Sequence, residues 1–450
     1  MFKWIFISLF LISTLWAHTD STDKMLVSFK LTPEISKFLH EEEFDVTGVN
    51  HDQGIIHALL TQEEINKFEQ KNVKMMTMLP QLLLRGPDPE YQNHQEIEDA
   101  LKNYQQKYSD LTELVEIGKS LEGRSIWAIR ISDNVKNKDY DEPVILFNSM
   151  HHAREVMTPE ISLDIIDYLL SNYKSDKKVQ NWVDGNEIWV IPMFNVDGNN
   201  IMWTKDSMWR KNARNGHGVD LNRNYPFGWN SCNGSSSSTG SQTYRGPNPA
   251  SEPETQAMMD FISKIKPVFN ISYHSYSELV LYPYGCKPNV ATNSEVVAIG
   301  KEMGKRLKYK AGTPWELLYN ADGGDIDWMY QVEQVIPYVI EVNSTMEGFH
   351  PNYKRSRDKT VERNRLGWQY LFERLEGSGI RGRVQSQENN VNIEVSQFGK
   401  KILNYKVNPD GTFHLILPAG EYNLVFRGLN MGQVSKSVKI ENKLVRLESI

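Results

Sequence analysis

The chain has 450 residues, of which 40% are hydrophobic and 11% are aromatic. That length predicts two or three domains, and this apolar content excludes a largely disordered protein. The formal net charge is −7 and no basic run occurs, which argues against nucleic acid as the main partner.

The first seventeen residues have the pattern of a targeting segment. Lys3 supplies a positive charge, the stretch Trp4–Trp16 is apolar, and Ala17 follows it. The apolar stretch is shorter than the roughly 20 residues that span a bilayer, so a secretory signal peptide over 1–17 is favoured over a membrane anchor. We therefore expect a mature protein that is secreted, periplasmic or extracellular, without membrane attachment.

A short alternation of strand and helix patterns fills residues 20–80. The order is β-α-β-β-α-β, which predicts a small ferredoxin-like module. Residues 81–90 follow, and Arg85-Gly86-Pro87 within them indicates an exposed linker. The predicted strands are 26–31, 44–49, 54–60 and 73–78, and the predicted helices are 33–41 and 62–71.

The main body, residues 91–376, also alternates strands with helices. This pattern predicts an α/β fold in which a mixed central sheet carries helices on both faces. The main predicted strands are 115–117, 126–131, 144–148, 187–192, 268–274 and 337–342, and two clear helices are 159–173 and 360–376.

The last part of the chain, residues 380–450, contains strand patterns only. Gly377-Ser378-Gly379 precedes it and predicts a hinge. Short strands separated by turn residues predict a small β-sandwich, and no residue in it suggests chemistry. The predicted strands are 391–395, 412–417, 422–426 and 435–440.

The chain contains two cysteines, Cys232 and Cys286. In an oxidising compartment they could form one disulfide. Two isolated thiols do not make a cysteine-based zinc site, so the ligands of any metal have to be histidines and carboxylates.

A histidine-rich segment lies between a predicted strand and a predicted helix. Its residues 149–155 are Ser-Met-His-His-Ala-Arg-Glu. A histidine and Glu155, three or four residues apart in a helical turn, can chelate one cation, and zinc accepts both ligand types. The spacing leaves His151 and His152 as alternatives, and a surface turn without a metal is the competing interpretation.

Two more candidate residues lie in apolar strands. His274 ends one of them, and sites in α/β sheets form at that end, although a structural histidine is the common alternative. Glu341 lies in the apolar run 336–342, where an ionised carboxylate is costly unless it is paired or functional. Glu341 is therefore a candidate base, with a buried ion pair to an arginine as the alternative.

Together these residues belong to a series of motifs that resembles the zinc metallocarboxypeptidase family of the carboxypeptidase A/B type. The resemblance covers about residues 91–376, and the family's HxxE element selects His152 over His151. Tyr319 precedes Glu341 by 22 residues, which also fits the family. The motifs, in the family's order, are His152-Ala153-Arg154-Glu155, Trp209-Arg210-Lys211-Asn212, Asp220-Leu221-Asn222-Arg223-Asn224, Tyr244-Arg245-Gly246-Pro247, Ser251-Glu252-Pro253-Glu254-Thr255 and His274-Ser275-Tyr276-Ser277.

The resemblance implies a hydrolase that acts on peptide C-termini with one zinc ion. His152, Glu155 and His274 would bind the zinc. Glu341 would transfer protons, and Arg210 would stabilise the oxyanion.

For substrate binding, the resemblance implies that Asn222 and Arg223 hold the terminal carboxylate, because a guanidinium can donate two hydrogen bonds to it. Tyr319 would close over the bound residue, and Arg154 would add positive potential along the peptide's path. For each arginine taken alone, a surface salt bridge is the alternative.

The resemblance also extends to the flanking modules. Residues 20–80 resemble the family's inhibitory pro-domain, which implies a zymogen cleaved at Arg85-Gly86; a permanent N-terminal domain is the alternative. Residues 380–450 resemble the transthyretin-like domain of some carboxypeptidases. We expect a monomer.

The predicted substrate preference depends on the base of the family's specificity pocket. Ile326 and Gly285 occupy the matching positions and carry no charge, which favours hydrophobic or aromatic C-terminal residues. Asp322 and Asp325 lie beside them, and either one turning inward would admit a basic residue. Two other functions stay open: a peptidase of cell-wall peptides and a secreted binding protein without catalysis. The binding protein is disfavoured because every catalytic position holds a competent residue.

Overall fold

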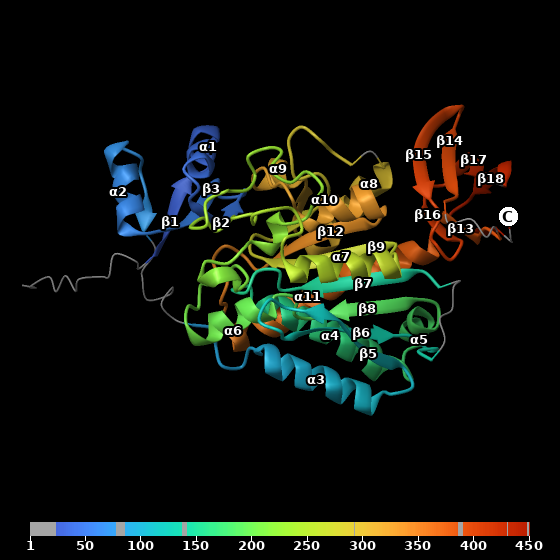
Figure 1. Cartoon of the computed structure of the whole chain (residues 1–450), viewed down its shortest axis with the longest axis horizontal. Helices are drawn as coiled ribbons and strands as arrows, with labels where there is room; N and C mark the ends of the chain where they lie inside the picture. The colour runs from blue at the N-terminus through green and yellow to red at the C-terminus, as the bar shows by residue number, and fades with distance from the viewer. Residues whose placement is uncertain are drawn as a thin grey trace, which may run out of the picture.

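The computed structural model describes residues 24–77, 86–136, 142–291, 293–385, 390–429, 431–447 and 450. The predicted signal peptide and Arg85 lie outside these residues. Figure 1 shows an N-terminal module at one end, a large α/β body in the middle and a β module at the other end. Within the described part of the chain, no helix has the length and apolar character needed to cross a membrane.

Two capped helices and four strands make up the N-terminal module. Helix α1 begins at Pro33, and the hydroxyl of Thr32 accepts a hydrogen bond from the Ile35 amide. Helix α2 follows Thr61, which forms a capping box with Glu64. The strands form an antiparallel sheet in the order β2-β3-β1-β4, so the predicted ferredoxin-like element order is confirmed. The elements are β1 (Met25–Lys30), α1 (Pro33–Glu41), β2 (Asp45–Asn50), β3 (Ile55–Leu60), α2 (Gln62–Gln70) and β4 (Met76–Thr77).

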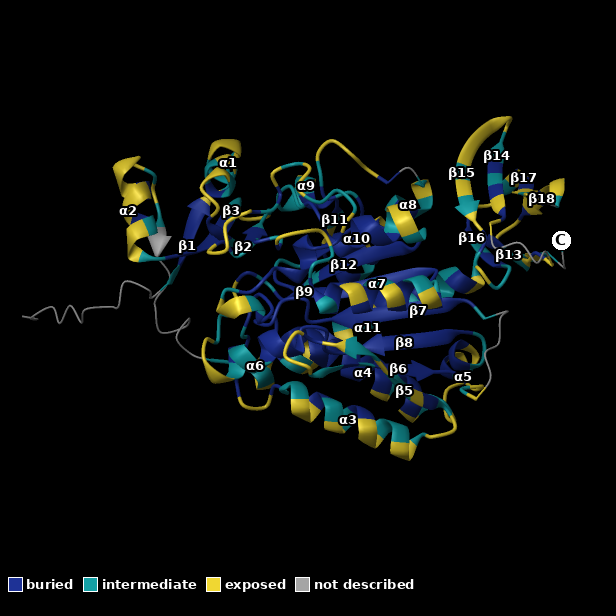
Figure 2. Ribbon diagram, viewed as in Figure 1, coloured by how far each residue is buried: buried dark blue, intermediate teal, exposed yellow. Residues whose placement is uncertain are grey.

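An eight-stranded mixed sheet forms the central body, in the order β11-β10-β12-β9-β7-β8-β6-β5. Strands β8, β7, β9 and β12 run parallel, whereas β6 and β10 are antiparallel to β8 and β12. Strands β7, β8 and β9 are buried along their whole length (Figure 2), which agrees with the apolar runs 144–147 of β7 and 188–191 of β8. The strands are β5 (Thr112–Lys119), β6 (Ser125–Ile131), β7 (Val144–Ser149), β8 (Glu187–Ile191), β9 (Phe269–Ser275), β10 (Leu279–Leu281), β11 (Lys310–Gly312) and β12 (Ile336–Val342).

Helices cover both faces of this sheet, as predicted. Phe147 of β7 packs against Trp368 of α11. Trp189 of β8 pairs with Leu146 and therefore points to the opposite face, where it packs against Phe261 of α7. The helices of the body are α3 (His94–Lys107), α4 (Met157–Asn172), α5 (Lys177–Asp184), α6 (Val196–Thr204), α7 (Pro253–Ile265), α8 (Ser294–Leu307), α9 (Pro314–Leu317), α10 (Asp325–Trp328) and α11 (Tyr353–Glu376).

The C-terminal module consists of two sheets around its own apolar core. The three-stranded sheet has the order β16-β13-β19 and the four-stranded sheet β15-β14-β17-β18. Buried side chains from both sheets, including Ile380, Val395, Phe413 and Phe426, form that core. The strands are β13 (Gly379–Arg383), β14 (Asn392–Gln397), β15 (Lys400–Lys406), β16 (Thr412–Ile416), β17 (Gly420–Gly428), β18 (Gly432–Ile440) and β19 (Leu444–Leu447).

Several predicted bounds differ from the structure. Helix α11 begins at Tyr353 rather than at residue 360, and the strand predicted over 73–78 is limited to Met76–Thr77. Strands β13, β15 and β19 were not predicted. In β15 only Leu403 and Tyr405 pack against the core of the module, and this alternation is too short to mark a strand in the sequence. The division of the chain into domains at residues 80, 90 and 376 stays a prediction.

Candidate active site

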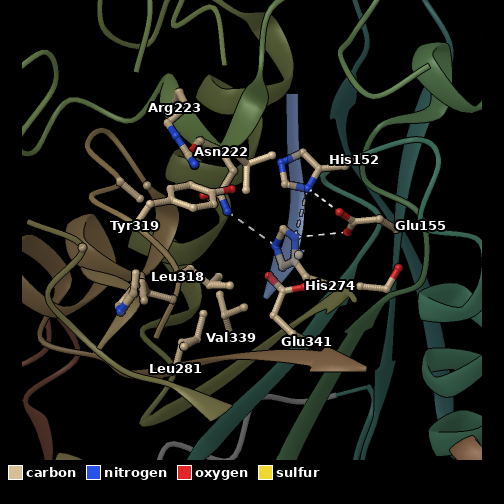
Figure 3. A pocket seen from close by; sticks show the side chains of 18 of the residues that line it. His152, Glu155, Asn222, Arg223, His274, Leu281, Leu318, Tyr319, Val339 and Glu341 are labelled. Atoms are coloured by element: carbon tan, nitrogen blue, oxygen red, sulfur yellow. Dashed lines mark hydrogen bonds and ion pairs between the residues drawn. The ribbon is translucent and has the colours of Figure 1, made fainter. Parts of the chain in front are cut away.

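Three buried side chains converge at the ends of two neighbouring parallel strands. His152 and Glu155 lie in the turn between β7 and α4, and His274 lies near the end of β9. The Nδ1 atom of His152 is 2.8 Å from Glu155 Oε1, and His274 Nδ1 is 3.1 Å from both His152 Nδ1 and Glu155 Oε2 (Figure 3). The predicted ligand pair thus lies in a turn that precedes α4, not in a helical turn.

The opposite ring nitrogens of these histidines are held by other side chains. His152 Nε2 is 3.1 Å from Asp220 Oδ1, which can accept the Nε2 hydrogen, and in that tautomer Nδ1 is available as a ligand atom. His274 Nε2 lies 3.2 Å from the Ser272 hydroxyl. Both imidazoles therefore present Nδ1 to the same point.

The donor set fits a zinc ion. Two imidazole nitrogens and a carboxylate are the ligands of many catalytic zinc sites, and tetrahedral bonds of about 2.0–2.1 Å separate ligand atoms by about 3.3 Å, close to the separations found here. Burial lowers the pKa of His274, but Glu155 outweighs this effect and raises it. Because a metal ligand has to be unprotonated, binding of a cation here and protonation of His274 would compete.

His151, the alternative ligand, belongs to a different environment. Its ring is fully buried, packs against Phe194, and has Nε2 3.1 Å from the Tyr225 hydroxyl. Burial, with His274 and His152 adding to it, holds its pKa well below the usual value, so the ring is neutral. His151 supports the site from behind and is not part of the group of possible metal ligands.

Glu341 lies next to His274, because the two residues are register partners in the parallel pair β12 and β9. It is the one half-buried residue of an otherwise buried strand and lines the cavity. Burial raises the pKa of Glu341 to about 8, and a nearby divalent cation would lower it again. The alternative of an ion pair to arginine is not found for Glu341 among the described residues.

Arg210 is anchored beside the metal ligands by Asp220. Its Nε and Nη2 donate to Asp220 Oδ2 at 3.2 and 2.9 Å, and its Nη1 is 4.0 Å from Glu155 Oε1. Burial raises the pKa of Asp220, but Arg210 and His152 outweigh this and hold it well below its usual range. One ionised carboxylate therefore orients both His152 and Arg210.

Of the residues predicted to bind the substrate carboxylate, Asn222 lies beside His274, with its Nδ2 3.5 Å from His274 Nε2. Asn222 and Arg223 follow Asp220, and Arg223 donates to the carbonyl oxygens of Gly234 and Asn222 at 2.9 and 2.7 Å. Tyr319 is half-buried, with its ring centroid 5.9 Å from the Arg223 guanidinium carbon (Figure 3).

Apolar side chains form the adjoining part of the cavity. Ile326 is buried and packs in one cluster with Leu281 and Val339, with Leu318 beside them. Of the acids near Ile326, Asp322 points away from the cavity, because its Oδ2 accepts hydrogen bonds from backbone amides.

Two other acids do line the cavity. Asp325 accepts a hydrogen bond from the Ile326 amide at 2.7 Å. The two oxygens of Asp327 accept from the Gly285 amide at 3.0 and 2.9 Å. Burial raises the pKa of Asp327 to about 7, so this acid is partly protonated near neutral pH.

A disulfide joins Cys232 and Cys286, which settles the pairing that the sequence left open. Cys286 follows Gly285 in the cavity wall, and Cys232 precedes the loop in which Gly234 holds Arg223. The bond therefore braces two walls of the same cavity.

Arg154 points away from the metal ligands toward the N-terminal module. Its Nη1 and Nη2 each donate to Asp45 at 2.9 Å, and its guanidinium lies 4.2 Å from the centre of the Phe349 ring. Asp45 and Asp220 are among the site residues to which the sequence analysis assigned no role. Asp220 stands two residues before Asn222, so its place in that motif was the available signal.

A buried His-Glu-His group with a carboxylate beside it is the arrangement of a zinc hydrolase. The family model for zinc carboxypeptidases matches residues 97–365. Bovine carboxypeptidase O is 30% identical over 55% of this chain and 68% of the relative, and rat carboxypeptidase B is 33% identical over 57% and 64%. The chain belongs to the zinc carboxypeptidase family, which consists of peptide hydrolases that use one zinc ion.

The fold agrees with this assignment. The crystal structure of carboxypeptidase A from Helicoverpa armigera superposes with a TM-score of 0.68, covering 79% of this chain and 97% of that one at 24% identity. That likeness extends beyond the region of the family match.

Proposed function

We propose that this chain is the precursor of a secreted, monomeric carboxypeptidase that removes single residues from peptide C-termini. It prefers hydrophobic or aromatic C-terminal residues and accepts basic ones less well. The observation that carries the proposal is one continuous cavity, lined by His152, Glu155 and His274, by Glu341, by Arg223 and by an apolar wall. The disulfide supports secretion, since such bonds persist in oxidising compartments.

The catalytic roles follow from the position of each group. When bound, zinc supplies Lewis-acid chemistry that polarises a carbonyl and acidifies a water. Glu341 takes the proton of the attacking water and gives it to the leaving amine. Arg210, fixed by Asp220, presents its guanidinium where negative charge develops.

Substrate binding uses the part of the cavity that extends from His274 past Asn222. Asn222 and Arg223 receive the terminal carboxylate, and Tyr319 closes over the bound residue. The last side chain of the peptide packs against the apolar wall of the cavity, where a hydrophobic residue is favoured. This wall is formed by Leu281, Leu318, Ile326 and Val339. Asp325 and Asp327 at its margin account for a weaker acceptance of basic residues.

The N-terminal module is proposed to be an inhibitory pro-domain. Its strand β2 passes across the site, and Val46, Thr47 and Gly48 line the same cavity (Figure 3). A side chain at Gly48 would come within 2.5 Å of the Tyr276 ring, so this strand approaches the cavity wall closely. Cleavage after Arg85 would free the cavity. For residues 380–450 we propose a transthyretin-like domain without a catalytic role.

The test is hydrolysis of a short peptide ending in Phe by the chain cleaved at Arg85, with and without a zinc chelator. We expect release of the last residue that the chelator abolishes. Glu341→Gln should lower kcat by 10²–10⁴-fold without loss of zinc, because a general base contributes about that much. Glu302→Gln on the exposed side of α8 is the matched control and should leave kcat unchanged.

The same assay with peptides ending in Arg and with cell-wall peptides separates the alternatives. Faster turnover of the Arg peptide would overturn the hydrophobic preference. Turnover of cell-wall peptides alone would replace the proposed substrate class. Normal kcat in Glu341→Gln would remove that residue from the mechanism.

A further inference from the structure

A single buried carboxamide connects two parts of the site that are distant in sequence. Asn195 is fully buried at the start of α6. Its Nδ2 lies 3.0 Å from the backbone oxygen of His151 and 3.1 Å from that of Lys211, with the Arg210 oxygen at 3.4 Å. One amide group thus bonds to the turn that carries the metal ligands and to the segment that carries Arg210.

Backbone hydrogen bonds join the same segments. The Ala153 amide donates to the Arg210 oxygen at 3.0 Å, and the Asn195 amide donates to the Met150 oxygen at 3.0 Å. Space is limited on the other side, because a side chain at Gly198 would come within 2.4 Å of the Lys211 oxygen. The segment with Arg210 therefore cannot shift toward α6.

The oxygen and the nitrogen of the Asn195 carboxamide have different roles. Its Oδ1 accepts the Gly198 amide at 2.9 Å and caps helix α6, a local stabilising contact. Its Nδ2 makes the contacts between segments and contributes nothing to the cap. A substitution that keeps the acceptor and removes the donor therefore separates stability from positioning.

We propose that Asn195 is a positioning residue that holds Arg210 in register with the metal-ligand turn. It touches neither substrate nor metal ligand side chains and acts through the backbone at residue 210. A charge-stabilising group has to be aligned before the reaction, and a displacement of about 1 Å can cost on the order of 10²-fold in rate. The inference rests on the oxyanion role proposed above for Arg210.

The test is Asn195→Asp in the full chain after activating cleavage. The aspartate keeps the size and the cap, but it presents an oxygen to three carbonyl oxygens. We expect kcat to fall by about 10- to 100-fold, with KM changed less than threefold and one zinc retained. Asn293→Asp, a substitution at the cap of α8 away from the site, is the control and should keep kcat.

A double-mutant cycle with Arg210→Met decides whether Asn195 acts through Arg210. Adding Asn195→Asp to Arg210→Met should lower kcat less than twofold further. Independent, multiplicative losses would overturn the proposal, as would full recovery of kcat at saturating zinc, which would assign Asn195 to metal affinity alone. If Asn195→Asp does not fold, Asn195→Ser, which keeps a capping oxygen and adds no charge, is measured in the same cycle.

The cycle also distinguishes this inference from the proposed function. Unchanged kcat in Arg210→Met alone would remove Arg210 from the mechanism, and the role of Asn195 would fall with it. Normal kcat in Asn195→Asp beside an impaired Arg210→Met would overturn the positioning role and leave the proposed function intact.

Discussion

The two flanking modules contact the catalytic body in different ways. The N-terminal module reaches the cavity with buried polar contacts. Asp45 accepts two hydrogen bonds from Arg154, and the Thr47 hydroxyl lies 2.6 Å from the Tyr276 hydroxyl. The C-terminal module contacts the body through Gln334, which bonds to backbone atoms of Asn404 and Lys406 in β15, and through Ile416 of β16, which packs into the apolar core of the body. Figure 1 shows the modules at opposite ends of the body.

The difference shows what each interface can control. Apolar residues Leu26 and Leu59 of the N-terminal module cover Tyr276 and Phe349, which line the cavity. Its His40 ring packs on Tyr319 at 4.7 Å between centroids. An interface built on site residues can regulate activity, whereas one built on backbone hydrogen bonds and an apolar contact, both distant from the cavity, can mainly contribute stability.

The largest expected effect concerns Asp45. Asp45→Asn leaves the Arg154 charge buried without its partner, and removing one member of a buried ion pair costs about 3–5 kcal/mol. That energy corresponds to inhibition weaker by about 10²–10³-fold or more. We expect the uncleaved chain to gain activity, as measured by hydrolysis of a peptide ending in Phe.

The control for this experiment is Glu69→Gln in the same module. Glu69 is exposed on α2, which Figure 1 shows at the end of the module away from the body, so inhibition should not change. The cleaved Asp45→Asn enzyme, freed of its module, should match the wild type. An uncleaved Asp45→Asn chain as inactive as the wild type would contradict the regulatory role of this interface.

A second effect of the same interface is sensitivity to acid. Burial lowers the pKa of His57, and burial together with nearby Arg223 lowers that of His40. If the pKa of a histidine is lower in the complex than in the free module, the module binds with full affinity above the free pKa near 6.5. Its affinity falls progressively as the pH drops below that value. The Asp45 pKa is about 2, so its ion pair persists over this range.

We therefore expect the module to bind more weakly by up to about tenfold per histidine between pH 7 and 5.5. Binding of the released module to the Glu341→Gln enzyme can be followed by calorimetry, which avoids the pH dependence of catalysis. His40→Gln with His57→Gln should remove most of the dependence. An unchanged slope in that double variant would show that other groups titrate.

The sequence predicted the candidate metal site because its proposed ligands belong to local motifs. The short spacing of His152 and Glu155, and the position of His274 at a strand end, are visible without a fold. The choice between His151 and His152 rested on the family resemblance, since both spacings suit a chelate. The structure places only His152 with its Nδ1 toward the other two ligands.

Contacts between distant segments could not be predicted in this way. Asp45 and Arg154 are 109 residues apart and belong to separate modules, so no periodic pattern connects them. The contacts of Asn195 could not be predicted either. Its Nδ2 bonds to three backbone oxygens, and every residue has a backbone oxygen, so the sequence does not indicate which ones it meets. Strand β15 was missed because only Leu403 and Tyr405 in it pack against the core, which leaves too short an apolar alternation to recognise.

The smallest expected effect concerns the other interface. Gln334 ends the π-helical turn η4 (Met329–Glu333), and its side chain donates to the Asn404 oxygen at 2.9 Å and accepts the Lys406 amide at 2.7 Å. Gln334→Ala should lower the free energy of unfolding by about 1–2 kcal/mol, since each hydrogen bond contributes about 0.5–1.5 kcal/mol net. Because no site residue touches this contact, kcat should change less than twofold. Gln331→Ala in the same turn, which loses a bond to the Tyr284 hydroxyl but none to the sandwich, is the control, and a fall in kcat confined to Gln334→Ala would show that the C-terminal module also acts on the site.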